Sequence, residues 1–140
     1  MVKRILNISV LLFLIITASA NAADLCRDKA DLALNNLRTW QDLRFWYENY
    51  PGCDDGYFAE GVSDFVVRSL AKQWHTLPVL QQEISKNAKF KTFVMKHINT
   101  TTDGDDLKML AQNAKAKCPP DLHNLCNEIE KNAQSALNEM

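Results

Sequence analysis

Four cysteines, all of them downstream of a short hydrophobic N-terminal segment, restrict the folding of this chain more than any other feature. They are Cys26, Cys53, Cys118 and Cys126. In an oxidising compartment an even set of cysteines forms disulfides, which tie distant parts of a small domain together. The spacing contains no C-x-x-C pair, and so it fits neither a zinc site nor a thioredoxin motif. We therefore expect two structural disulfides, no bound metal and no other cofactor.

Residues 1–22 have the three parts of a secretory signal peptide. Lys3 and Arg4 supply the positive start, residues 5–17 form an apolar run, and Ala20-Asn21-Ala22 is a small-x-small cleavage site. The apolar run is shorter than the roughly 20 residues that a membrane-spanning helix needs. We predict a mature chain of residues 23–140 without a membrane span. Its expected location is the periplasm, with the extracellular space as the alternative.

The predicted mature chain is long enough for one domain with its own hydrophobic core. The full chain has 16 basic and 17 acidic residues, and the signal segment holds two of the basic ones, so the mature chain carries a net charge of −3 with neutral histidines. Proteins that bind nucleic acid normally show a basic face and an excess of basic residues, and neither is present here. Residues 23–140 are therefore predicted to form one domain that does not bind nucleic acid.

Hydrophobic residues recur at helical spacing along the whole mature chain, and no segment alternates with a period of two. Thr39 with Asp42 forms a potential capping box before a helix that Pro51-Gly52 ends, and Thr102 with Asp105 forms a second one. These signals predict an all-α domain, a compact bundle of about five to six short helices.

The most distinctive segment follows Cys53 and reads as the central helix. Asp54 or Asp55 is expected to cap its N-terminus, and Asp64 precedes Arg68 by one turn. Gly61 lies inside this helix, where glycine costs about 1 kcal/mol relative to alanine. It therefore suggests that another backbone or a ligand approaches closely at that point.

Four cysteines allow three pairings, of which two fit the expected helices. If the first two helices fold back on each other, Cys26 meets Cys53, while Cys118 and Cys126 flank a tight helix-to-helix turn. Alternatively, Cys53 pairs with Cys118 and Cys26 with Cys126, which closes longer loops and would stabilise the chain more on an entropic argument. We favour the first pairing by a small margin.

Aromatic and acidic residues crowd together around Cys53 and are the predicted contact residues for a partner. Consecutive aromatic residues on a helix cannot all face one side, so some should be exposed, as is typical of protein contacts. The alternative is that these rings wrap a small core. The predicted contact residues are Trp46, Tyr47, Tyr50, Asp54, Asp55, Tyr57 and Glu60.

Residue patterns for catalysis or metal binding are weak. The segment Asn99 to Asp106 has the polar composition of a calcium loop, but Leu110 stands where an EF-hand requires glutamate. The three histidines do not lie within one helical turn of each other, and no serine stands in a G-x-S-x-G motif. No catalytic residue is predicted, and an enzyme is the less favoured class.

The motif Cys53-Asp54-Asp55-Gly56, followed by Ala59-Glu60-Gly61 and later by Asp105-Asp106-Leu107-Lys108 and Cys118-Pro119, resembles small exported proteins of unknown function from Gram-negative bacteria. The resemblance spans most of the mature chain and implies no activity. In general build the chain is also similar to periplasmic immunity proteins that neutralise type VI secreted cell-wall amidases. Likeness of build does not transfer functional residues.

Three functions are compatible with the sequence. The favoured one is a small periplasmic domain that binds another periplasmic or secreted protein, including as an inhibitor or immunity protein for a secreted or cell-wall-active enzyme. The second is a small hydrolase that acts on cell-wall or glycan substrates through Glu60 and either Asp54 or Asp55. The third is an accessory factor in envelope assembly or virulence.

Overall fold

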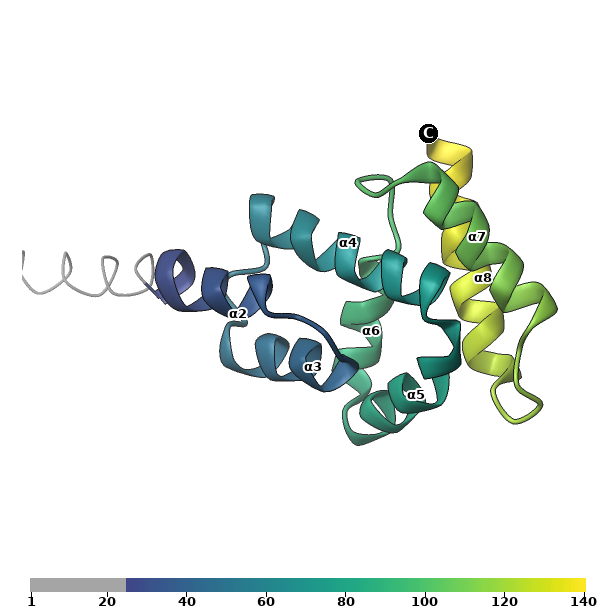
Figure 1. Ribbon diagram of the computed structural model, residues 1–140, viewed down its shortest axis with the longest axis horizontal. Coiled ribbons are helices and arrows are strands. Elements are labelled where there is room, and N and C mark those ends of the chain that lie inside the picture. The colour runs from purple at the N-terminus through teal and green to yellow at the C-terminus, as the bar shows by residue number, and fades with distance from the viewer. Residues whose placement is uncertain (1–24) are drawn as a thin grey trace, which may run out of the picture.

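The computed structural model describes residues 25–140 and is helical in that range, without strands (Figure 1). Seven α-helices, one π-helical segment and one 3-10 turn follow each other along this part of the chain. The all-α prediction is confirmed, whereas five to six helices is slightly too low. Asn87 begins one of the short helices, because its side chain accepts hydrogen bonds from the backbone amides of Lys89 and Phe90. The predicted signal segment, residues 1–22, lies outside the described residues.

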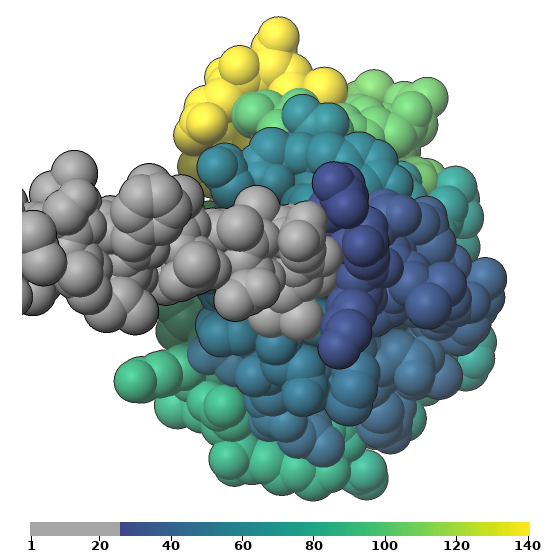
Figure 2. Space-filling view, turned by 90° about the vertical axis from the view of Figure 1, so that its left-hand side faces the viewer, coloured from purple at the N-terminus to yellow at the C-terminus, as the bar shows by residue number. Residues whose placement is uncertain are grey.

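The N-terminal part consists of η1 (Leu25–Ala30), α2 (Asp31–Asn35) and α3 (Trp40–Asn49). The capping box at the start of α3 is confirmed: the Asp42 amide donates to the Thr39 hydroxyl, and the Thr39 amide donates to the Asp42 carboxylate. Figures 1 and 2 both show α2 lying between α3 and the next helix, α4. This arrangement brings η1 and the end of α3 together.

Helix α4 (Gly56–Lys72) lies between the N-terminal helices and the C-terminal ones (Figure 1). Asp55 is its N-cap, and Gly56 adopts a φ of 48°, a left-handed conformation that glycine accepts without a steric penalty. The close approach predicted at Gly61 is present, but a side chain makes it: a Cβ at this position would lie 2.8 Å from Leu34 Cδ2. Helix α2 therefore packs directly against Gly61.

A 3-10 turn, η2 (Trp74–Thr76), leads into α5 (Leu77–Lys86) and α6 (Ala88–Lys96). The indole of Trp40 donates to the Thr76 hydroxyl over 2.9 Å, which fixes the start of α5 against α3. Buried Glu83 on α5 accepts from the guanidinium of Arg44 on α3. Helices α3 and α5 are therefore joined at two points.

Helices α7 (Gly104–Ala116) and α8 (His123–Glu139) form an antiparallel hairpin that packs on α4 through α7 (Figure 1). The predicted capping box of Thr102 with Asp105 is wrong. Asp103 caps α7 instead, because its carboxylate accepts from the amides two and three residues further on.

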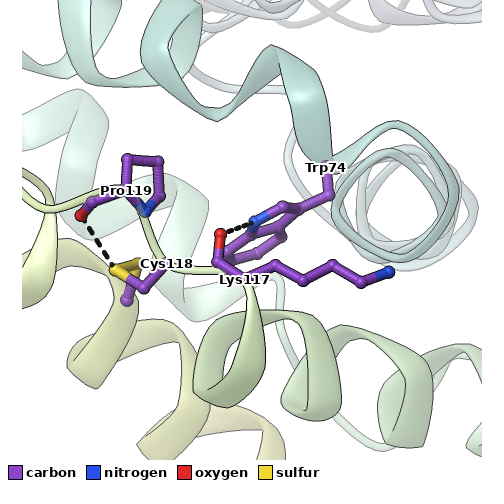
Figure 3. The surroundings of a disulfide bond; sticks show 5 residues. Trp74, Lys117, Cys118 and Pro119 are labelled. Carbon is purple, nitrogen blue, oxygen red and sulfur yellow. Dashed lines mark hydrogen bonds between the residues drawn. A yellow bond between two sulfur atoms is a disulfide. The ribbon is translucent and has the colours of Figure 1, made fainter.

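The disulfides join Cys26 to Cys53 and Cys118 to Cys126, which confirms the favoured pairing. The second disulfide closes the turn between α7 and α8. Figure 3 shows the Trp74 indole reaching this turn, where it donates to the Lys117 carbonyl over 2.9 Å.

Among residues 25–140 no helix is both long and apolar enough to cross a membrane. Two disulfides are typical of proteins from an oxidising compartment.

Candidate functional site

The Cys26–Cys53 disulfide organises the end of the molecule where the predicted contact residues lie. It anchors η1 to the segment between α3 and α4, with the two Cα atoms 5.4 Å apart. Asp55 then ends this segment as the N-cap of α4. The residues that follow Cys53 are therefore held by a covalent bond on one side and a helix on the other.

Trp46 does not belong to the surface, which corrects the prediction that it contacts a partner. Its side chain is fully buried, and its indole N–H donates to the Ala30 carbonyl over 3.0 Å. The rings of Phe58 and Phe93 lie 6.4 Å from it on different helices. Trp46 is a core residue, as in the alternative in which the rings wrap a small core.

Tyr47 and Tyr50 are half-buried against the same core. The Tyr47 ring lies 4.8 Å from the Phe93 ring, and the Tyr50 ring lies 6.2 Å from the Trp46 ring. Each tyrosine thus offers only part of its ring to solvent. Their main role in the structure is to extend the aromatic core outwards.

Three of the seven predicted contact residues are exposed: Asp55, Tyr57 and Glu60. Tyr57 is the most informative of them, because 59% of a large aromatic residue is exposed at the first turn of α4. Glu60 follows it at a spacing of three residues and so lies on the same side of the helix. Tyrosine and acidic side chains therefore share one exposed face of α4.

Tyr57 also lines a pocket of about 200 Å³ between α2 and α4, with Leu34 and Gly61 in its wall. A second pocket, of about 270 Å³, shares Arg38 and Phe65 with the first and continues towards Thr76. We call these two adjoining pockets the α2–α4 groove. The groove was not predicted from the sequence, because α2 and α4 meet through residues more than 20 positions apart.

Arginines provide the positive charge along the α2–α4 groove. Arg38 is exposed and donates to the Asn35 and Leu37 carbonyls, so it caps the end of α2. Arg68 forms the predicted ion pair with Asp64, at 3.3 Å between two exposed side chains. An exposed pair of this kind adds less than about 1 kcal/mol to stability, which leaves both groups available to another molecule.

Asp54 is the predicted contact residue that is held most firmly. Its carboxylate lies 2.8 Å from the Lys96 ammonium and 3.1 Å from Nε2 of His97, and only 15% of the side chain is exposed. These partners are more than 40 residues away in the sequence. Asp54 therefore connects the start of α4 to the end of α6 rather than facing outwards.

A buried polar cluster continues inwards from Asp54 and was not predicted from the sequence. Nδ1 of His97 lies 2.8 Å from the Ser63 hydroxyl, which also accepts a hydrogen bond from the side-chain amide of Asn99 over 3.0 Å. Burial lowers the pKa of His97, although the nearby Asp54 carboxylate opposes this effect. The imidazole is therefore neutral near pH 7.

Serine, histidine and aspartate in contact have the composition of a hydrolase triad, but their burial excludes this role in the present conformation. Ser63 and His97 are each only 1% exposed, so no substrate reaches the hydroxyl. Hydrolysis requires a nucleophile within reach of the scissile carbonyl. The cluster is therefore structural in this conformation.

Within residues 25–140, histidine, cysteine and acidic side chains form no group of three or more that could hold a metal ion.

Comparisons of the chain with protein-family models, with curated proteins and with solved structures gave no match. The fold and the surface define a class of protein: a disulfide-linked helical domain with an exposed face made of Tyr57, Glu60 and the α2–α4 groove.

Proposed function

We propose that this protein is a small exported domain that binds another periplasmic or secreted protein. The observation that carries the proposal is the exposed ring of Tyr57 at the edge of the α2–α4 groove, beside Arg38 and Arg68. Tyrosine and arginine are enriched among the residues that dominate binding energy at protein interfaces. A rigid scaffold under such residues lowers the entropic cost of association.

The scaffold under this face is fixed in two ways. The Cys26–Cys53 disulfide holds the segment before α4, and Leu34 of α2 lies directly on Gly61 of α4. A contact face that is ordered before binding suits a protein that occludes another protein. Inhibition of a secreted or cell-wall-active enzyme is the specific form of binding that we propose.

A capture experiment on the mature, oxidised protein tests the proposal. The protein, residues 23–140, is immobilised and exposed to periplasmic extract of its own species and of competing bacteria, and bound proteins are identified by mass spectrometry. We expect one stoichiometric partner that is retained by the wild type and lost by Tyr57→Ala. Phe45→Ala is the matched control, because Phe45 is also aromatic and 56% exposed but lies on α3, outside the lining of the α2–α4 groove.

The inhibitory form of the proposal requires a second step. If the captured partner is a hydrolase, an equimolar amount of the protein should abolish its activity on isolated cell wall. Retention of full activity in the complex would refute inhibition while leaving the binding proposal intact. Equal capture by the wild type and Tyr57→Ala would refute the proposed contact face.

A further inference from the structure

The buried cluster around His97 joins three parts of the chain that are far apart in sequence. Asp54 precedes α4, Ser63 lies inside α4, and His97 follows the last residue of α6. The imidazole contacts both of the other residues, at 3.1 Å to Asp54 and 2.8 Å to Ser63. The cluster thus connects the start of α4 to the end of α6, next to the segment held by the Cys26–Cys53 disulfide.

The contact between His97 and Asp54 is close but poorly aligned. Nε2 of His97 and Oδ1 of Asp54 are both buried, and neither makes a hydrogen bond of acceptable geometry within the described residues. A buried polar atom without a well-formed hydrogen bond costs free energy. The pair is therefore less stable than its short distance implies.

The hydroxyl of Ser63 can satisfy either protonation state of the imidazole. It lies 2.8 Å from Nδ1 of His97 and 2.8 Å from the Ala59 carbonyl, and it has one proton to donate. With neutral His97 protonated at Nε2, the hydroxyl donates to Nδ1. With charged His97, Nδ1–H donates to the Ser63 hydroxyl oxygen, and the hydroxyl donates its own proton to the Ala59 carbonyl.

Among the described residues, two charged groups act on the imidazole: the Asp54 carboxylate from the segment before α4 and the Lys96 ammonium from α6, which pairs with Asp54. The contacts from α4 and from the segment after α6 are uncharged, since they come from Ser63, the Ala59 carbonyl and, through Ser63, Asn99. Asp54 attracts a proton on His97, whereas Lys96 and the burial of the ring oppose it. Burial is the largest of these effects, and the pKa of His97 is lowered as a result.

We propose that Asp54, Ser63 and His97 form a proton-sensitive clasp that holds the start of α4 against the end of α6 and loosens in acid. When the clasp opens, His97 becomes hydrated and binds a proton more readily than it does when buried. Opening therefore becomes more favourable as the pH falls below the ordinary histidine pKa of about 6.5, and this continues down to the lower pKa of the closed form. This inference does not depend on a binding partner.

The first test is an NMR titration of the His97 ring in the oxidised wild-type protein. We expect its midpoint below pH 6.5, with Nε2 as the protonated nitrogen at neutral pH. A midpoint at or above 6.5 would overturn the proposal. The wild type alone gives this answer, so it does not depend on whether a variant folds.

The second test is native-state hydrogen exchange of the amides in the first two turns of α4, at pH 7.5 and pH 5.5 and corrected for intrinsic exchange rates. The opening equilibrium should rise by up to about tenfold per pH unit below 6.5, because opening is linked to the uptake of one proton. His97→Gln should remove this rise, and His123→Gln, which changes an exposed histidine, should retain it. An equal rise in wild type and His97→Gln would assign the effect to other groups and refute the clasp.

Discussion

Replacing Glu83 by glutamine should produce a loss of stability that is large for a change of a single atom. The Glu83 side chain is 2% exposed, and its carboxylate accepts hydrogen bonds from Arg44 and from Lys86. Removing one partner from a fully buried ion pair costs about 3–5 kcal/mol. Here Arg44 and Lys86 are 28% and 58% exposed, so water compensates in part. We expect the free energy of unfolding to fall by about 2–3 kcal/mol at pH 7.

The effect should depend on pH in a defined direction. The hydrogen bond from Lys86 is the main cause that holds the pKa of Glu83 below its ordinary value, and burial opposes it. The stability contributed by the ionised carboxylate is therefore complete above the unfolded pKa of about 4.3 and is lost as the pH falls through the lower folded pKa. The difference between wild type and Glu83→Gln should shrink below about pH 4.

Urea denaturation followed by circular dichroism measures this difference, and Glu48→Gln is the matched control. Glu48 also pairs with Arg44, at 2.7 Å, but its side chain is 42% exposed. The control should lose less than about 1 kcal/mol. Equal losses in the two variants would refute the argument that burial of the carboxylate determines its contribution.

Three further changes test the fold. Trp46→Ala should lower the free energy of unfolding by about 3–5 kcal/mol in urea denaturation, because it empties a fully buried site. Phe45→Ala, which changes an exposed neighbour, should lower it much less. Similar losses in the two variants would contradict the burial of Trp46. Thr39→Ala should cost about 1 kcal/mol by removing the capping box, and an unchanged denaturation midpoint would show that the cap contributes nothing. Replacing both Cys118 and Cys126 by alanine opens a short loop with a sequence separation of 8. The free energy of unfolding should fall by about 2.5 kcal/mol on the chain-entropy argument. A denaturation midpoint as high as that of the oxidised wild type would refute this expectation.

Local signals in the sequence predicted local structure well. The Thr39 capping box, the Asp64–Arg68 pair and the closing of the turn between α7 and α8 by a disulfide all involve residues within one or two helical turns of each other. The start of α7 was placed incorrectly, because Thr102 and Asp103 are both good caps and the residue pattern alone does not rank them.

Contacts between distant segments were not predictable in the same way. Ser63 and His97 are separated by 34 residues, and each also fits an ordinary helix face, so neither position signals a shared polar cluster. Trp46 was predicted to be exposed because three consecutive aromatic residues cannot all be buried by one helix face. The structure instead exposes Phe45 and covers Trp46, since rings from α4 and α6 close over it.

The dissociation constant of the purified complex, measured by calorimetry with the partner captured from periplasmic extract, tests the central claim most directly. Truncation of a residue that dominates binding at an interface costs about 2 kcal/mol or more of binding free energy. We therefore expect Tyr57→Ala to weaken binding by at least about tenfold, and Phe45→Ala to stay within about twofold of the wild type. Equal affinities for the wild type and Tyr57→Ala, with both proteins folded, would contradict the proposed binding face.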